Sequence, residues 1–217
     1  MKMIETLEQP FLAIKDGKVL QVGVADYSAL IGDNTLLFDA QQKVVVPGFI
    51  DSHSHLVHAG SRENEFEQLR QGVPYLDILK AGGGILGTVE KTRKASFNEL
   101  YNQAKKSLDV MLSYGVTTLE AKSGYGLDYE NEVKQLEVMK KLNDNHPVHL
   151  VPTYMAAHAV PKEFSNNKRG YIDAMLADLE KIKATNLTEF VDVFCETGVF
   201  DLNETREILE AAKTLGF

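Results

Sequence analysis

The alternation of strand-like and helix-like segments after residue 47 is the feature that most constrains the fold of this chain. Runs of β-branched and apolar residues predict strands, and apolar residues that recur every three or four positions predict amphipathic helices. Strand and helix alternate four times, which predicts an α/β protein with a parallel sheet. After a first strand that ends at His55, the predicted segments are a helix from 97, opened by the capping-box pair Ser96 and Glu99, strands 116–121, 148–154 and 190–195, and helices 129–144, 171–184 and 203–215.

Residues 47–55 carry the clearest chemical signal in the sequence. The β-branched residues 44–46 lead into this stretch, which predicts a buried strand whose carboxyl end carries His53 and His55. Successive side chains of a strand point to opposite faces, so the two imidazoles share one face and can reach one metal ion. The alternative interpretation is a pair of hydrogen-bonded polar histidines at a strand end.

A small β segment is predicted before this strand. Asp16-Gly17 separates the apolar runs 11–15 and 18–22 and suits a two-residue hairpin turn. A further short strand is expected at 35–38. Because so small a β unit is too small to be stable by itself, we expect residues 1–46 to depend on other strands for their stability.

Charge and composition argue against several classes of partner. The net charge of −8 and a pI near 5.3 argue against a nucleic-acid-binding surface. No stretch approaches the roughly 18 apolar residues of a membrane span, and the N-terminus has no apolar signal core, so we expect a soluble cytoplasmic protein with no membrane contact. The single cysteine, Cys195, lies in the apolar run 190–195 and is predicted to be a buried thiol of a reducing compartment.

The stretch 47–55, Pro-Gly-Phe-Ile-Asp-Ser-His-Ser-His, resembles the first-strand signature of the amidohydrolase superfamily. The resemblance implies a TIM-type (β/α)₈ barrel in which His53 and His55 bind one divalent metal ion, zinc or iron. It also implies that residues 1–46 belong to a composite β domain. A complete barrel takes about 250 residues. The resemblance therefore implies that residues 47–217 are the first half of a barrel and that the chain is the truncated N-terminal portion of an enzyme.

Six sequence blocks narrow the resemblance to the imidazolonepropionase family. In chain order they are Asp-Ser-His-Ser-His-Leu-Val-His-Ala-Gly-Ser-Arg-Glu, Tyr-Leu-Asp-Ile-Leu, Gly-Gly-Gly-Ile-Leu, Lys-Ser-Gly-Tyr-Gly-Leu, Ala-His-Ala and Glu-Thr-Gly-Val-Phe. The resemblance implies a hydrolase with a small-molecule substrate. Its reaction is the metal-dependent ring opening of 4-imidazolone-5-propanoate to N-formimidoyl-L-glutamate in histidine degradation.

Arg62 is the residue that the resemblance assigns to the propanoate group of that substrate. It lies seven residues beyond His55, and its planar guanidinium can form two parallel hydrogen bonds with a carboxylate. The alternative is a surface ion pair with Glu63 or Glu65, because most charged residues lie on the surface. The family match favours substrate binding.

Two tyrosines and a histidine complete the set of site residues that the resemblance implies. Tyr125 lies between two glycines after the second strand, at the end of the sheet where barrel enzymes bind substrate. It contacts substrate or packs the loop down, and Tyr75 has the same two interpretations. His158 follows the third strand and matches a catalytic family residue that polarises or orients the carbonyl under attack.

The resemblance also implies a third histidine ligand, a general base and an aspartate further along the chain. All six histidines lie at or before His158, so we expect this chain to be inactive alone. Two alternatives stay open: a non-catalytic pseudoenzyme or binding fragment, and another cyclic-amide hydrolase or deaminase of the superfamily. The choice between zinc and iron, and between a monomer and a homo-oligomer, also stays open.

Overall fold

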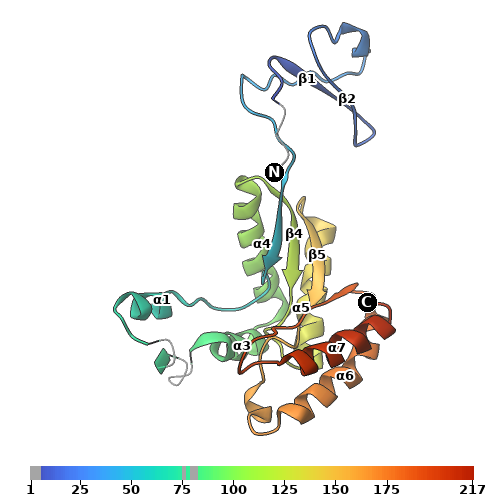
Figure 1. The fold of residues 1–217 in the computed structure, drawn as a ribbon. Coiled ribbons are helices and arrows are strands. Elements are labelled where there is room, and N and C mark those ends of the chain that lie inside the picture. The colour runs from blue at the N-terminus through green and yellow to red at the C-terminus, as the bar shows by residue number, and fades with distance from the viewer. Residues whose placement is uncertain (1–5, 75–76, 79–82) are drawn as a thin grey trace. The chain divides into compact units, whose positions relative to one another are not determined.

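The computed structural model describes residues 6–74, 77–78 and 83–217 (Figure 1). The chain divides into two compact units, Met1–Val46 and Pro47–Phe217. None of the helices in these described residues combines the length and the apolar character that crossing a membrane requires.

The first unit contains an antiparallel hairpin of β1 (Pro10–Lys15) and β2 (Lys18–Val24), followed by the 3₁₀ turn η1 (Ser28–Leu30). Asp16 and Gly17 have φ angles of 51° and 72°, the left-handed conformation of a two-residue hairpin turn. The predicted hairpin is confirmed.

The strand predicted at 35–38 was wrong. These residues have no regular secondary structure, and Leu36 and Phe38 are 95% and 94% exposed. A strand needs a neighbour that accepts its backbone hydrogen bonds, and in the described part of this unit β1 and β2 pair with each other alone. The apolar side chains of residues 35–38 suit a strand, but no neighbouring strand is present among the described residues to pair with them.

The second unit alternates strands with helices. Its elements are β3 (Phe49–Ser54), α1 (Glu63–Arg70), α3 (Gly84–Lys94), α4 (Phe97–Ser113), β4 (Val116–Lys122), α5 (Tyr129–Asn145), β5 (His149–Tyr154), η2 (Lys162–Phe164), α6 (Lys168–Thr185), β6 (Phe190–Val191) and α7 (Leu202–Thr214). The strands form one sheet in the order β3-β4-β5-β6, and each neighbouring pair is parallel. The predicted α/β class with a parallel sheet is confirmed.

β3 lies at the edge of this sheet, and the prediction that it is buried was wrong. In the described residues it pairs with β4 on one side only, which leaves Ile50 72% exposed. Residues 44–46, expected to lead into the strand, lie outside it and are exposed. The register with β4 shifts between Asp51 and Ser54, so strict alternation of side chains does not hold through His53.

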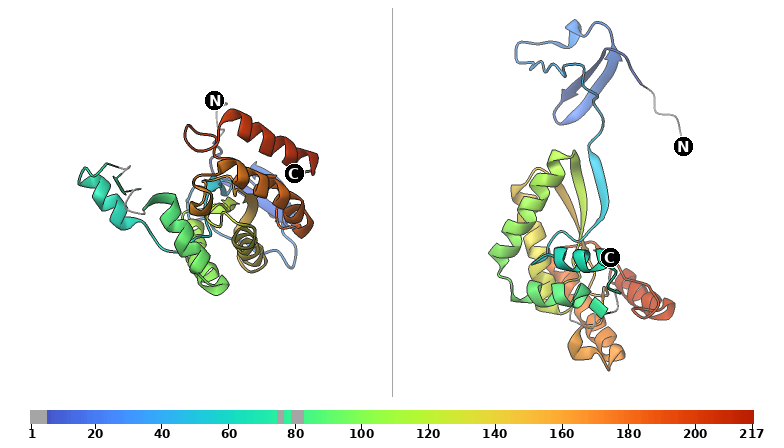
Figure 2. Two further views of the ribbon diagram at one scale, coloured as in Figure 1. Left: turned by 90° about the horizontal axis from the view of Figure 1, so that it is seen from below. Right: turned by 90° about the vertical axis from the view of Figure 1, so that its left-hand side faces the viewer.

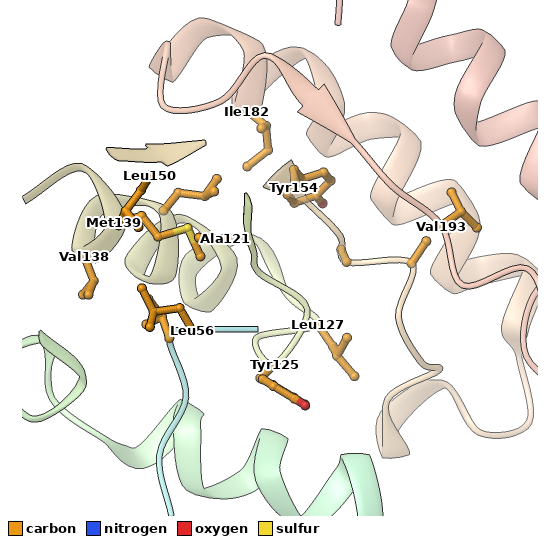
Figure 3. Packing of buried hydrophobic residues seen from close by; sticks show 14 of the residues in the cluster. Leu56, Ala121, Tyr125, Leu127, Val138, Met139, Leu150, Tyr154, Ile182 and Val193 are labelled. Atoms are coloured by element: carbon orange, nitrogen blue, oxygen red, sulfur yellow. The ribbon is translucent and has the colours of Figure 1, made fainter. Parts of the chain in front are cut away.

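The core lies between the sheet and a layer of helices. α4 packs against α5, α5 packs against β5 and α6, and α6 packs against α7 (Figure 2). Helices that are consecutive in this part of the chain are therefore neighbours in space. Ala121 of β4 and Leu150 of β5 lie beside Met139 of α5 in this core (Figure 3). The predicted capping box at the start of α4 is confirmed, because Ser96 and Glu99 each accept a hydrogen bond from the other's backbone N–H.

The last strand is shorter than predicted. β6 covers Phe190–Val191 instead of 190–195, and beyond it a single bridge joins Cys195 to Phe200. Cys195 is exposed, so the prediction of a buried thiol was wrong. The apolar run predicted burial, but the chain leaves the sheet before it reaches the cysteine.

The sheet–helix core predicts a large stability difference between two apolar truncations. Leu119 of β4 is fully buried, whereas Val110 of α4 is 55% exposed. Leu119→Ala should lower the free energy of unfolding by about 2–5 kcal/mol, the cost of a cavity in a packed core. Val110→Ala should change it by less than about 0.5 kcal/mol. Urea unfolding at one protein concentration measures both, and equal losses would contradict the assignment of the core.

Candidate active site

Aromatic rings from three connections meet at the carboxyl ends of the parallel strands. β3, β4 and β5 point the same way (Figure 1), and His55, Tyr125 and His158 lie just beyond their last residues. The rings of His55 and His158 are stacked, with centroids 4.3 Å apart and planes 8° from parallel. The Tyr125 ring lies 5.2 Å from that of His55 and 5.3 Å from that of His158. The fold thus brings together three of the predicted site residues.

Backbone carbonyls fix which ring nitrogen of each histidine carries a proton. Nδ1 of His55 lies 2.7 Å from the carbonyl oxygen of Ser123, and Nδ1 of His158 lies 2.9 Å from that of Gly124. A carbonyl oxygen only accepts hydrogen bonds, so each Nδ1 donates. In the neutral ring, Nε2 of each histidine is left with a free lone pair.

Burial keeps both rings neutral. Desolvation, followed by the repulsion that a charged His55 would experience if His158 were also protonated, lowers the pKa of His55 from 6.5 to about 3. Desolvation also lowers the pKa of His158, although its hydrogen bond to Gly124 opposes the shift. Near neutral pH both Nε2 atoms are therefore unprotonated, the state in which an imidazole binds a metal ion or accepts a hydrogen bond.

His53 and His55 fit two positions in the coordination shell of one metal ion. Their ring centroids are 6.0 Å apart, and the Ser123 carbonyl leaves Nε2 of His55 as its ligating atom. Bonds of about 2.0–2.1 Å from imidazole nitrogen to zinc leave room for an ion between such rings. Among the described residues, no group of three or more His, Cys, Asp or Glu side chains is arranged to hold a metal ion. By themselves these two histidines would therefore supply only part of the ligands that a metal ion requires.

A small pocket of about 100 Å³ lies beside the stacked rings. Its lining residues are His55, His58, Gly60, Ser61, Arg62, Thr88 and Tyr125. Burial lowers the pKa of both His58 and His158, and the charge of Arg62 adds to that lowering. Glu65, one alternative partner of Arg62, instead accepts a hydrogen bond from the backbone N–H of Gly84 at 3.0 Å.

The structure adds residues to this site that carried little signal in the sequence. His58 had no assigned role, yet it lines the pocket with its ring centroid 6.0 Å from that of Tyr125. Thr88 lies on α3, and nothing in its sequence context marks it as a site residue. Glu132 lies in the first turn of α5, where an acidic residue is expected for helix stability alone. Tyr75, also predicted to contact substrate, lies outside the described residues.

A charged network lies on the same carboxyl end of the sheet. Lys122 is 4% exposed, and its Nζ lies 2.7 Å from Glu120 and 2.8 Å from Asp192. The hydroxyl of Thr153 donates to Glu120 at 2.8 Å. Burial is the largest single influence on Lys122 and lowers its pKa, but the hydrogen bonds to the two carboxylates outweigh it and the pKa is raised. The ammonium group is therefore charged and paired.

A second, larger pocket of about 490 Å³ lies at the start of α7. Its lining residues are Cys195, Glu196, Thr197, Phe200, Asp201, Leu202 and Asn203. It contains none of the residues that the sequence predicts at the site. Although this pocket is the larger of the two, we therefore do not assign the active site to it.

The chain is similar over its whole length to curated proteins named imidazolonepropionase. It is 51% identical over 220 residues to the one from Alkaliphilus oremlandii, and 50% identical over 219 residues to those from Streptococcus pyogenes serotype M6 and Streptococcus sanguinis. Each match covers all of this chain and 52% of the relative, so the chain spans about half the length of these relatives. No family model matches it. The predicted resemblance is confirmed.

The charged network predicts a pH-dependent contribution to stability. Burial, the largest influence, raises the pKa of Asp192, but hydrogen bonds from Lys122 and Val193 outweigh it and the pKa falls below 3.8. A carboxyl group whose pKa is lower in the folded state stabilises the fold above its unfolded pKa, and this contribution is lost as pH falls through the folded value. Asp192→Asn should therefore destabilise the chain at pH 7 and have progressively less effect below about pH 4.

Urea unfolding of wild-type and variant chains from pH 7 to pH 3 tests this expectation. Asp144→Asn is the matched control, because Asp144 pairs with Lys140 on the surface with 60% of its side chain exposed. Such surface pairs contribute little. If Asp192→Asn lowers the free energy of unfolding by the same amount at every pH, the ion-pair interpretation is contradicted.

Proposed function

We propose that this chain forms the substrate-binding part of an imidazolonepropionase active site, with two of its metal ligands. The reaction is the hydrolytic opening of the 4-imidazolone-5-propanoate ring to N-formimidoyl-L-glutamate. The observation that carries the proposal is the pocket lined by His55, Tyr125 and Arg62, with the ring of His158 stacked on that of His55. About 50% identity to relatives of that name, along the whole chain, supports it.

We propose that the sheet is half of a TIM-type barrel. Two features support this: β3 and β6 are edge strands with no second neighbour among the described residues, and the site lies at the carboxyl ends of parallel strands. Active sites of (β/α)₈ barrels lie at that end. Residues 1–46 would then contribute strands to a separate β domain. The exposed apolar side chains Leu36 and Phe38 support a missing partner for that segment.

The histidine pair is the proposed metal site. His53 and His55 would hold one divalent ion, zinc or iron, through their imidazole nitrogens. When bound, such an ion lowers the pKa of water and so supplies the nucleophile for hydrolysis. The carbonyl of Ser123 would hold the His55 ring in its ligating orientation.

Arg62 is the proposed partner of the propanoate carboxylate. Its guanidinium offers two parallel N–H donors in a pocket that also contains His58 and Tyr125. A chain with a net charge of −8 does not attract anions by its overall field, so a particular cation must do so. Tyr125 is 7% exposed, and its ring lies beside the stacked rings of His55 and His158, where it would limit the position of the substrate ring.

His158 is proposed to orient the substrate ring through an accepted hydrogen bond. Its Nδ1–H donates to Gly124, so the neutral ring presents Nε2 as an acceptor and has no proton to give to a carbonyl. We therefore assign His158 to a ring N–H of the imidazolone. This role differs from polarising or orienting the carbonyl under attack, which the resemblance implies and which stays a prediction.

The test uses a completed protein, in which this chain is joined to the part of the Alkaliphilus oremlandii relative that lies beyond the match. Ring opening is followed with 4-imidazolone-5-propanoate as substrate. Activity of the completed protein supports the proposal. A completed, folded protein that binds metal but does not open the ring would favour a non-catalytic fragment or a different cyclic amide.

The substrate clamp gives the first prediction for the completed protein. Arg62→Lys replaces a planar fork with a point charge. The fall in kcat/KM should correspond to a loss of about 1.5–3 kcal/mol of transition-state stabilisation, while the metal content stays unchanged. Arg70→Lys, in the last turn of the helix that Arg62 precedes and in an exposed pair with Glu67, should have no effect. Wild-type kinetics in Arg62→Lys would remove Arg62 from the site.

The metal ligands give the second prediction. His53→Ala and His55→Ala should each remove bound zinc or iron from the completed protein, because two imidazoles are part of the ligand set. His149→Ala, an exposed histidine at the opposite end of β5, should keep it. Atomic absorption after dialysis measures the metal content. One metal ion per chain in either of the first two variants would show that the ion is bound elsewhere.

A further inference from the structure

A fully buried carboxylate, that of Glu132, lies beneath the loop that follows β4. It accepts hydrogen bonds from the backbone N–H of Gly124 at 3.0 Å and from those of Gly126 and Leu127 at 2.8 Å each. The hydroxyl of Ser123 lowers the pKa of this carboxyl. Each of these backbone groups donates a hydrogen bond, and an ionised carboxylate, which only accepts hydrogen bonds, requires donors around it.

The loop is packed closely between this carboxylate and His158. A Cβ atom added at Gly126 would lie 2.5 Å from the backbone nitrogen of Glu132. One added at Gly124, where φ is +105°, would lie 2.9 Å from Nδ1 of His158. Only glycine allows both approaches without displacement. A movement of the loop away from Glu132 would therefore change the hydrogen bond that His158 makes.

We propose that Glu132 is a positioning residue, whose carboxylate holds the loop so that consecutive carbonyls of Ser123 and Gly124 orient His55 and His158. The two carbonyl oxygens accept the Nδ1–H bonds of the stacked rings, and the amide groups of the same segment are bound by Glu132. One buried side chain thus determines the direction of both Nε2 atoms. The consequence for catalysis depends on the proposed function, but the arrangement itself does not.

A purely helical role does not account for this residue. An acidic side chain in the first turn of a helix stabilises the helix dipole, and the exposed Glu130 already provides one in α5. Burial raises the pKa of Glu132, and hydrogen bonds from the loop oppose that rise. Burying a carboxylate under the loop is costly unless hydrogen bonds compensate for its lost hydration, so the loop N–H groups must stay in position to donate them.

The tautomers of His55 and His158 provide a direct test of the proposal. Glu132→Gln introduces an amide NH₂ among backbone donors, so the loop should lose its single conformation. In ¹⁵N-histidine-labelled chain, long-range ¹H–¹⁵N spectra should show protonated Nδ1 in wild-type protein and a mixture of Nδ1–H and Nε2–H rings in the variant. Amide exchange at Gly126 and Leu127 should become about tenfold faster, as expected for lost hydrogen bonds.

Glu130→Gln is the matched control, because it removes the same charge from the same helical turn at an exposed position. It should leave the tautomers and the amide exchange unchanged. A folded Glu132→Gln chain with wild-type tautomers would overturn the proposal. If Glu132→Gln does not fold, Glu132→Asp decides in the same way, since it keeps the charge and shortens the side chain by one methylene.

The outcome is separable from that of the proposed function. The tautomer measurement needs neither metal nor turnover, so an inactive completed protein leaves it intact. In an active completed protein, Glu132→Asp should lower kcat more than it raises KM, because substrate binding by Arg62 is preserved while the histidines are displaced. Equal changes after Glu130→Gln would contradict a specific positioning role.

Discussion

Parallel pairing of β3, β4 and β5 is the constraint on which the rest of this structure depends. It places the carboxyl ends of the three strands at one edge of the sheet, so residues that are far apart in the chain become neighbours there. His55, Tyr125 and His158 each follow a different strand. Without that pairing, the stacked rings, the pocket with Arg62 and the Lys122 network would not form. The helices contribute mainly by packing their apolar side chains against the sheet.

The site is organised by the backbone more than by pairs of side chains. The carbonyls of Ser123 and Gly124 determine the orientation of His55 and His158, and burial lowers the pKa of both rings so that they stay neutral. Charge is kept nearby in a separate network around Lys122, where each ionised group has a partner. The unprotonated Nε2 of His55 suits metal binding and that of His158 suits a hydrogen bond from the substrate, which are the roles these atoms have in the proposed function.

Local signals were sufficient to predict part of this fold. The Asp16-Gly17 turn and the capping box of Ser96 depend on neighbouring residues and were confirmed. The strand at 35–38, the burial of β3 and the burial of Cys195 were predicted from apolar side chains and were wrong, because burial also requires a partner element. The motif residues were found by resemblance, whereas the stacking of His55 on His158 and the role of Glu132 depend on how distant loops pack.

The most direct test is a crystal structure of the completed protein with a non-hydrolysable ring analogue of the substrate that retains the propanoate. The central claim is that substrate binds in the small pocket beside the stacked histidines, not in the larger one at Cys195. We expect the carboxylate of the analogue to accept hydrogen bonds from Arg62 and its ring N–H to donate a hydrogen bond to Nε2 of His158. An analogue bound next to Cys195, or with its carboxylate away from Arg62, would contradict it.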